Sequence, residues 1–418
     1  MSEALVAASP WRSRVTSGAA TGARWLAIAI GFTLPVSTAM DNVLLALLLA
    51  CWLASGGWQE KFAAIRANPV ALAILALFTL VALGLAWSHG PLQDGLLYLK
   101  KYSNLLLMPI LVTVFTNATD RQRGLLAFAA AMALTALLSV ALAVGALPVG
   151  GVITGMPSDP TVFKKHITQN LFMAFGFLVF AEFARCSAKR SHRLLWAGLA
   201  ALAAFDVLLV HGRSGYLVLP ALAVLLLFER WRWRGLAAAV VAVLVSFAVA
   251  YQLSSGFRGR VSAAEVEARQ WQPGVATQTS VGIRLEFYRN TLGIIEQHPL
   301  IGVGTGGFAE AYAQRVQGTG MQPTYNPHNQ YLLITAQLGV VGLVLLLWVF
   351  AQWWRCARQL PGEIEQTLAR GLVLTYVIAS LLNSVLIDHA EGLLFGWMGG
   401  LLFASLRSPE CAKAGHTA

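Results

Sequence analysis

The sequence predicts an all-α polytopic integral membrane protein, with about 12 transmembrane helices and one large extramembrane loop containing short helices. One observation is composition: 57% of the 418 residues are hydrophobic and only 12% are charged, whereas soluble domains carry about 25% charged residues. The other is a series of apolar runs close to the roughly 20 residues that a helix needs to span a bilayer. A water-soluble enzyme, a disordered protein and a secreted disulfide scaffold are therefore excluded.

Twelve apolar runs are candidates for the transmembrane helices. They are rich in Leu, Ala and Val, and they lack the alternation of polar and apolar residues expected of a membrane β-strand. The second, fourth and eighth are short for a full span, so we expect their ends to extend into the flanking residues. Their approximate bounds are 25–40, 42–55, 69–87, 103–116, 124–147, 166–184, 194–210, 215–228, 235–253, 328–349, 370–387 and 391–406.

The placement of Lys and Arg predicts the orientation. With the N-terminus in the cytoplasm, most of the 30 basic residues fall on the cytoplasmic side, as the positive-inside rule requires. They form short clusters between apolar runs, which is typical of orienting charges. We therefore expect membrane lipids and no nucleic acid as partners. The four cysteines fall on or near the reducing side, without the spacing of a metal site or a disulfide framework.

The runs divide the chain into three parts. Residues 1–253 are expected to form a nine-helix transmembrane region, 254–327 a large loop subdomain, and 328–418 a three-helix transmembrane region with a short cytoplasmic tail. Within the loop, residues 283–295 have apolar side chains near helical spacing, which predicts an amphipathic helix. Pro299 and several glycines then end the pattern.

Basic residues on the outer side oppose the orientation rule, so they are candidates for function. Arg213 is the sharpest case, because it lies in the very short turn 211–215 between two apolar helices. The alternative is that Arg213 extends to lipid headgroup phosphates. The other outer basic residues away from the large loop are Lys100, Lys101, Lys164 and Lys165.

Arg284 and His328 are candidates within and after the loop. From its spacing alone, Arg284 is favoured as a solvated charge on a surface helix. If Arg213 and Arg284 converged on one cleft, however, they would form a bidentate clamp for a diphosphate. His328 follows Pro327 and is expected in the first turn of the tenth span. A neutral imidazole there can accept a proton from a hydroxyl, although a structural histidine is the alternative.

His166 opens the sixth span and could line the same cleft. The sequence contains no phosphate-binding Gly-rich loop, dinucleotide fingerprint or zinc-protease motif. We therefore expect chemistry on the outer face with no cofactor, no metal and no ATP.

Three segments together carry a resemblance to a known family. They are the turn His211-Gly-Arg213-Ser-Gly, the loop segment Gly282-Ile-Arg284-Leu-Glu-Phe with His298-Pro-Leu-Ile-Gly-Val-Gly-Thr-Gly, and the loop exit Asn326-Pro-His328-Asn-Gln-Tyr-Leu. In this order and membrane context, the chain resembles the O-antigen ligase and polymerase superfamily of bacterial envelope glycosyltransferases, and the ligase branch most closely. One departure is His211-Gly212, where the family often has Ser before the Arg.

The resemblance implies a function and a set of site residues. Members of the family transfer a glycan from an undecaprenyl diphosphate carrier, and ligases pass it to lipid A–core oligosaccharide at the periplasmic face of the inner membrane. The family's essential arginines correspond to Arg213 and Arg284, and its essential histidine corresponds to His328. The large loop is then expected to be periplasmic. The expected substrate-binding residues are Arg213, Arg284, Lys100, Lys101, His166, Gln169 and Asn329.

Several alternatives stay open at this point. No carboxylate stands out as a covalent nucleophile, so a single inverting displacement is preferred, with His328 as general base. A Wzy-type polymerase would use the same donor, and so would a protein O-oligosaccharyltransferase. A lipid-linked glycan flippase or a solute transporter would be expected to carry charged or broken helices at the bilayer midplane, where this sequence has few charges.

Overall fold

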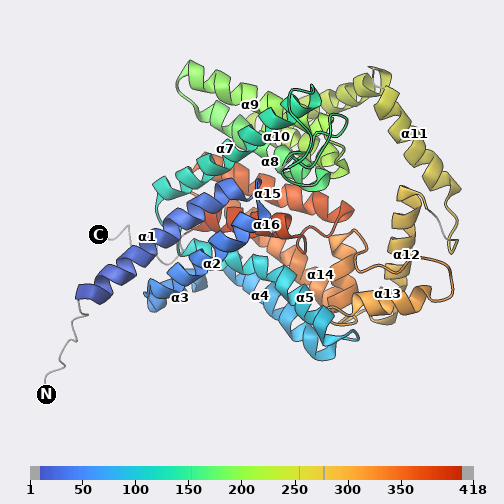
Figure 1. Ribbon diagram of the computed structural model, residues 1–418, viewed down its shortest axis with the longest axis horizontal. Helices are drawn as coiled ribbons and strands as arrows, with labels where there is room; N and C mark the ends of the chain where they lie inside the picture. The colour runs from blue at the N-terminus through green and yellow to red at the C-terminus, as the bar shows by residue number, and fades with distance from the viewer. Residues whose placement is uncertain (1–9, 152, 254, 276–277, 407–418) are drawn as a thin grey trace.

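The computed structural model describes residues 10–151, 153–253, 255–275 and 278–406, and these residues form an all-helical protein (Figure 1). Extended pairing within them is limited to two isolated bridges, at Gly150–Ile153 and Met156–Asp159. The elements are α1 (Pro10–Thr33), α2 (Thr38–Ala54), α3 (Trp58–Arg66), α4 (Pro69–Leu83), η1 (Gly84–Trp87), α5 (Leu92–Tyr102), η2 (Ser103–Leu106), α6 (Leu107–Val112), α7 (Ala118–Ala143), α8 (His166–Cys186), α9 (Arg190–Leu209), α10 (Arg213–Leu253), α11 (Ser255–Gln270), α12 (Ser280–Gln297), α13 (Phe308–Val316), α14 (Gln330–Ala357), α15 (Glu363–Leu382) and α16 (His389–Phe403).

Six helical segments among the described residues are long and apolar enough to cross a membrane. A seventh is added if α2 and α3, which meet at 113°, count as one span. The six are Pro69–Trp87, Ala118–Ala143, His166–Cys186, Arg190–Leu209, Ser214–Ala238 and Gln330–Ala357. The described residues are therefore all-helical, with six candidate membrane spans that are consistent with a multi-pass membrane protein. The number of 12 spans stays a prediction. The other predicted runs lie largely in helices that are shorter or more charged, such as α6, α15 and α16.

The long helix α10 is broken where a basic turn between two spans is predicted. Arg232 has non-helical angles, with φ 52° and ψ −130°. The rings of Phe228 and Trp233 lie 5.8 Å apart, and a Cβ on Gly235 would stand 1.8 Å from the Leu227 carbonyl oxygen. Residues eight apart in a straight helix are separated by about 12 Å. The chain therefore turns sharply between Phe228 and Gly235.

The last helix, α16, lies in the centre of the packed helices (Figure 1), and all its residues from Ala390 to Phe403 are buried. Phe395 of α16 stacks on Trp353 of α14 with ring centroids 4.2 Å apart. Trp397 donates from Nε1 to the Ala27 carbonyl of α1, so the first and last helices meet in the core. This packing fixes the start of α16, which borders the candidate site.

The segment 254–327 forms α11, α12 and α13 along one edge of the protein (Figure 1). The amphipathic helix expected at 283–295 is confirmed as α12, whose N-cap Thr279 accepts a hydrogen bond from the Gly282 amide. After α12, a turn docks on α14: the amides of Val303 and Gly304 donate to the carbonyls of Ala336 and Gln337. The loop segment is thus tied to the first half of α14.

This contact depends on Gly339, where α14 is interrupted at φ 64°. A Cβ on Gly339 would stand 2.0 Å from the Leu300 carbonyl oxygen, so we expect Gly339→Ala to destabilise the protein by about 2–4 kcal/mol, through the strained φ and the overpacking. Gly318→Ala is the matched control, because Gly318 also has a positive φ but nothing within 4 Å. Thermal unfolding in detergent measures both variants, and equal melting temperatures would contradict the docking.

Candidate functional site

The ends of several helices meet around the residues that precede α14. Helix α8 begins at His166, α10 at Arg213 and α14 at Gln330, while α15 ends at Leu382. The turn 383–388 connects α15 to α16. It lies against the residues just before α14, which we call the entry to α14, because Ser384 Oγ donates to Asn326 Oδ1 over 2.7 Å. Residues distant in sequence are thereby brought to one end of the helix bundle.

His328 lies just before α14, not in its first turn as the sequence suggested. The helix begins after Asn329, because the Asn329 side chain accepts a hydrogen bond from the Leu332 amide and acts as N-cap. His328 has φ 55°, a conformation that costs a non-glycine residue about 1–2 kcal/mol. It is held there by its amide, which donates to Asn326 Oδ1 over 2.8 Å. Strain of this kind points to a functional role.

The imidazole of His328 is oriented by two further side chains. Its Nδ1 lies 3.1 Å from Asn383 Oδ1, and Asn383 Nδ2 donates to Asp388 Oδ2 over 3.2 Å. Because the amide nitrogen of Asn383 faces the Asp388 carboxylate, the amide oxygen of Asn383 faces His328. The proton must then reside on Nδ1, which leaves Nε2 as the proton-accepting nitrogen of the neutral ring.

Two lysines and His328 lie near Asp388. Burial raises the pKa of Asp388 above its usual range, and the charges of Lys101, His328 and Lys165 oppose that rise. Lys101 also lies 5.3 Å from the centroids of the Tyr98 and Tyr325 rings. The structure therefore brings Lys101, which the sequence analysis selected, to the same carboxylate as His328.

Helix α12 lies against the other side of the entry. Tyr288 Oη donates to the carbonyl oxygens of His328, over 3.3 Å, and Leu381, over 3.2 Å. Burial raises the pKa of Tyr288, and the charge of Arg284, one turn earlier on α12, lowers it. Arg284 and Tyr288 are four residues apart, so they lie on the same face of α12.

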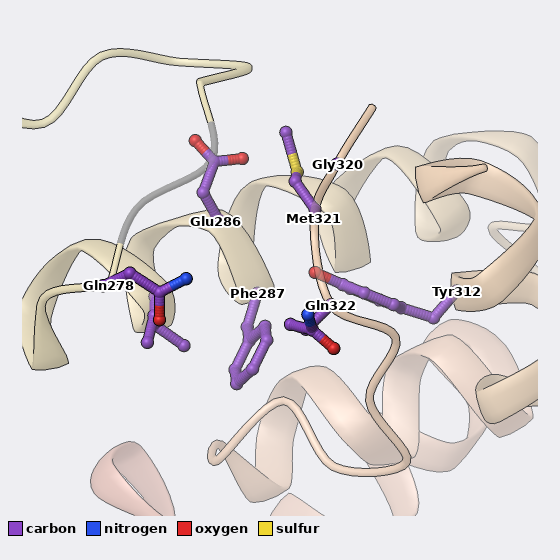
Figure 2. Close-up of a pocket in the computed structure, with 8 residues that line it drawn as sticks. Gln278, Glu286, Phe287, Tyr312, Gly320, Met321 and Gln322 are labelled. Carbon is purple, nitrogen blue, oxygen red and sulfur yellow. The ribbon is translucent and has the colours of Figure 1, made fainter. Parts of the chain in front are cut away.

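The ring of Phe287 packs against the imidazole of His328. Its ring is nearly parallel to that of His328, with centroids 6.1 Å apart, and it meets Tyr312 edge-on at 5.9 Å. Figure 2 shows Glu286 and Phe287, neighbours on α12, among the residues that line a small cavity of about 60 Å³. Glu286 is buried and accepts hydrogen bonds from Trp271 Nε1 and the Gly274 amide. It joins the segment before α12 to that helix.

Arg213 is the first residue of α10, and its side chain lies outside what the structure describes. Its turn packs on the start of α8: a Cβ on Gly212 would stand 2.3 Å from Asn170 Cβ and 2.8 Å from the His166 carbonyl oxygen. Asn170 Nδ2 donates to the carbonyls of Val207 and Val210 at the end of α9. The backbone of Arg213 is thus fixed beside His166.

The remaining expected residues occupy different environments. Lys100 is exposed in the last turn of α5, and His166 is exposed at the start of α8. Gln169 is buried, and its amide bonds the Val162 amide and Asp206 Oδ2, so we leave it out of the proposed site. Asn329 uses both ends of its amide for the cap and for the Leu381 carbonyl, which makes it a support for the entry.

Sequence reasoning missed Asn383, Asp388 and Tyr288. Asn383 falls inside the apolar run 370–387, and only its polarity in that run could have signalled it. Asp388 lies in the short turn between the last two runs, as Arg213 lies in its own turn. Arg213 was selected as a charged residue in a short turn between two apolar runs, and the same criterion applied to acidic residues would have selected Asp388.

Comparisons with known proteins bear on this arrangement. A chain from Haemophilus influenzae, described as an uncharacterized protein, is 24% identical over 265 residues, which are 61% of this chain. This chain spans 65% of the length of that relative. A solved structure, described as "Structural coordination of polymerization and crosslinking by a peptidoglycan synthase complex", has a TM-score of 0.46 at 19% identity, over 81% of this chain and 96% of that chain.

A family model described as O-Antigen ligase matches residues 198–347. That segment runs from α9 to α14 and contains Arg213, Arg284 and His328. Over these residues, the match confirms the resemblance to the O-antigen ligase family.

Proposed function

We propose that this protein is an O-antigen ligase, which transfers O-antigen polysaccharide from undecaprenyl diphosphate to the lipid A–core oligosaccharide. The observation that carries the proposal is the orientation of His328, within the segment matched by the ligase model. Asn383 and Asp388 fix the tautomer that offers Nε2 as a base. A base of this kind suits a reaction in which a sugar hydroxyl is the nucleophile.

The proposed reaction is a single displacement. An acceptor hydroxyl oxygen attacks the anomeric carbon of the donor sugar while the bond from that carbon to the phosphate oxygen breaks. The hydroxyl proton passes to His328 Nε2, and undecaprenyl diphosphate leaves as an anion. Attack opposite to the leaving group inverts the anomeric centre. The donor is already activated, so the step uses neither ATP nor a metal.

Arg213 and Arg284 are proposed to bind the diphosphate of the donor. A guanidinium donates two parallel hydrogen bonds to phosphate oxygens, and such groups stabilise the charge that develops on a leaving group. Lys101 beside Asp388 adds positive charge at the same end of the bundle. Lys100 and His166, both exposed near that end, are the proposed outer contacts of the donor or acceptor.

The site is proposed to face the periplasm from the inner membrane. The charge pattern supports this orientation, because it predicts Arg213 and the entry to α14 on the side away from the basic clusters. Residues 254–327, which form α11 to α13, are then the periplasmic loop subdomain, between transmembrane regions 1–253 and 328–418.

Expression in a Gram-negative strain that lacks its own ligase tests the proposal. With the matching core genes supplied, we expect a restored lipopolysaccharide ladder on a gel. Unligated core with long chains accumulating on the carrier lipid would contradict ligation. Growth of long chains in a strain that makes only single repeats would instead identify a Wzy-type polymerase, and glycan on protein Ser or Thr would identify an oligosaccharyltransferase.

Asp388 gives the reaction an expected pH dependence. As a carboxylate it stabilises the imidazolium that forms on His328 during transfer. The negative charge of Asp388 is present above its pKa and is lost as the pH falls through that pKa. Because the pKa of Asp388 is raised, the charge is lost at a higher pH than in an ordinary aspartate. Asp388→Asn keeps an acceptor for Asn383 but never carries the charge. We expect wild type to exceed the variant by about tenfold at high pH, the equivalent of ~1.4 kcal/mol.

Initial rates of transfer, measured from mildly alkaline pH downward to the lowest pH at which both proteins stay folded, test this effect. The ratio of wild-type to Asp388→Asn rates should fall toward one as the pH is lowered. A constant ratio across the range would mean that Asp388 acts only in folding. Asp94→Asn, at the start of α5, is a control that should leave the ratio at one throughout.

A further inference from the structure

A second polar cavity lies at the opposite ends of the helices that form the candidate site. Helices α8, α10 and α14 begin at the site and α15 ends there, whereas the cavity is lined by the other end of each: Arg185 on α8, Arg232 at the break in α10, Arg358 after α14 and Glu363 at the start of α15. Its volume is about 670 Å³. The charge pattern predicts this end of the bundle to be cytoplasmic.

The carboxylates of the cavity are already paired. Five arginines and three glutamates line it. Arg185 bonds Glu182 over 2.8 Å and Glu363 over 2.9 Å, and Arg370 bonds Glu229 over 3.1 Å. These pairs join α8, α10 and α15, so they have a structural role.

Three arginines of the lining remain: Arg230, Arg232 and Arg358. All three are exposed, and within the part of the chain that the structure describes none has an ion pair with a carboxylate. The backbone of Arg232 has a φ of 52°, which is unfavourable for any residue other than glycine. Guanidinium groups gathered at one cavity are suited to phosphate, which they bind in bidentate fashion.

The lining also contains four apolar side chains: Leu225, Leu226, Phe228 and Trp354. A small soluble phosphate has nothing to place against these side chains, whereas a phospholipid carries glycerol and acyl chains directly next to its phosphate. A tryptophan near the end of a membrane helix is also typical of the headgroup level of a bilayer. Arginines without an ion pair among the described residues, together with apolar side chains in the same lining, therefore favour a lipid over a soluble anion.

We propose that this cavity is a binding site for the phosphate of an anionic phospholipid from the cytoplasmic leaflet. Arg230, Arg232 and Arg358 contact the headgroup phosphate, and the acyl chains begin along Phe228 and Trp354. Basic pockets between transmembrane helices on the cytoplasmic side bind anionic headgroups in this way. The site is separate from the one proposed for glycan transfer, and its occupation does not depend on that reaction.

Retention of lipid by the purified full-length protein tests the proposal. The protein is exchanged into micelles containing equal amounts of phosphatidylglycerol and phosphatidylcholine, and bound lipids are counted by native mass spectrometry. We expect retention of phosphatidylglycerol over phosphatidylcholine. Arg230→Gln and Arg358→Gln should each lower it about fivefold, the equivalent of ~1 kcal/mol per basic residue. Arg190→Gln, at an exposed arginine outside the cavity at the start of α9, should behave as wild type.

Three outcomes would overturn the proposal. The first is equal retention of the two lipids by wild type, and the second is unchanged retention in the double variant Arg230→Gln/Arg358→Gln. The third is displacement of phosphatidylglycerol by millimolar inorganic phosphate, which would identify a soluble anion as the ligand. Melting temperatures measured on the same samples separate loss of binding from loss of fold, because a folded variant melts as the Arg190→Gln control does.

Discussion

Replacement of His328 by Ala is expected to lower the rate of glycan transfer by about 10² to 10⁴-fold, the range for loss of a positioned general base. The proton of the acceptor hydroxyl would then have no acceptor at the position that Asn383 and Asp388 prepare. Initial rates with purified protein, or the intensity of the lipopolysaccharide ladder at matched expression, measure the loss.

His328→Ala alone leaves an ambiguity, because Ala is also unfavourable at φ 55°. His328→Asn removes it: Asn, like His, is among the non-glycine residues most often found at positive φ, and its amide cannot accept a proton near neutral pH. Both variants should lose transfer and still accumulate in the membrane. His192→Ala, an exposed histidine near the start of α9, is the control. Transfer by His328→Asn within tenfold of wild type would remove His328 from the role of base.

Much of the fold was predictable from the pattern of hydrophobic residues. Most apolar runs predicted helices that the structure places at similar bounds, and the spacing of residues 283–295 predicted α12. Two runs did not: 25–40 crosses the break between α1 and α2, and 103–116 contains only η2 and the short helix α6. The turn at Arg232 was also visible, because charged residues interrupt two apolar runs there. Local periodicity was sufficient in these cases, since each feature depends on residues close together in sequence.

The site required contacts that periodicity does not encode. His328 was selected for its own chemistry, but its orientation depends on Asn383, 55 residues later. The apolar run 370–387 was expected to continue as helix, whereas α15 ends at Leu382 and leaves the turn 383–388 to reach the entry. Which residue meets which is decided by the packing of α14, α15 and α16, so neither Asn383 nor Asp388 could be assigned a partner from the sequence.

The same packing separates Arg284 from the arginines that line the second cavity. Arg284 belongs to the end of the bundle where Tyr288 contacts the His328 backbone, whereas Arg230, Arg232 and Arg358 line the cavity at the other end. Composition alone counts all of them as net positive charge. Their positions divide that charge between a proposed diphosphate donor on one face and a proposed lipid on the other.

Replacement of Arg284 by Ala is expected to lower transfer by about 10² to 10³-fold, the range for removal of one donor that stabilises developing negative charge. The leaving diphosphate gains charge as the glycosidic bond breaks, and Arg284 lies where its charge already acts on Tyr288. Arg284→Lys keeps the charge but loses the two parallel hydrogen bonds, so we expect it to recover only part of the rate.

Arg289→Ala is the matched control, because Arg289 is exposed on the same helix and lies 3.9 Å from Glu286, away from Tyr288. The loss in Arg284→Ala should appear in the rate at saturating donor as well as in donor affinity, because the interaction strengthens as the leaving group becomes charged. A variant that binds donor weakly but reaches the wild-type rate at saturation would limit Arg284 to ground-state binding. Full activity of Arg284→Lys would show that positive charge is sufficient, since Lys cannot reproduce the bidentate geometry of the guanidinium.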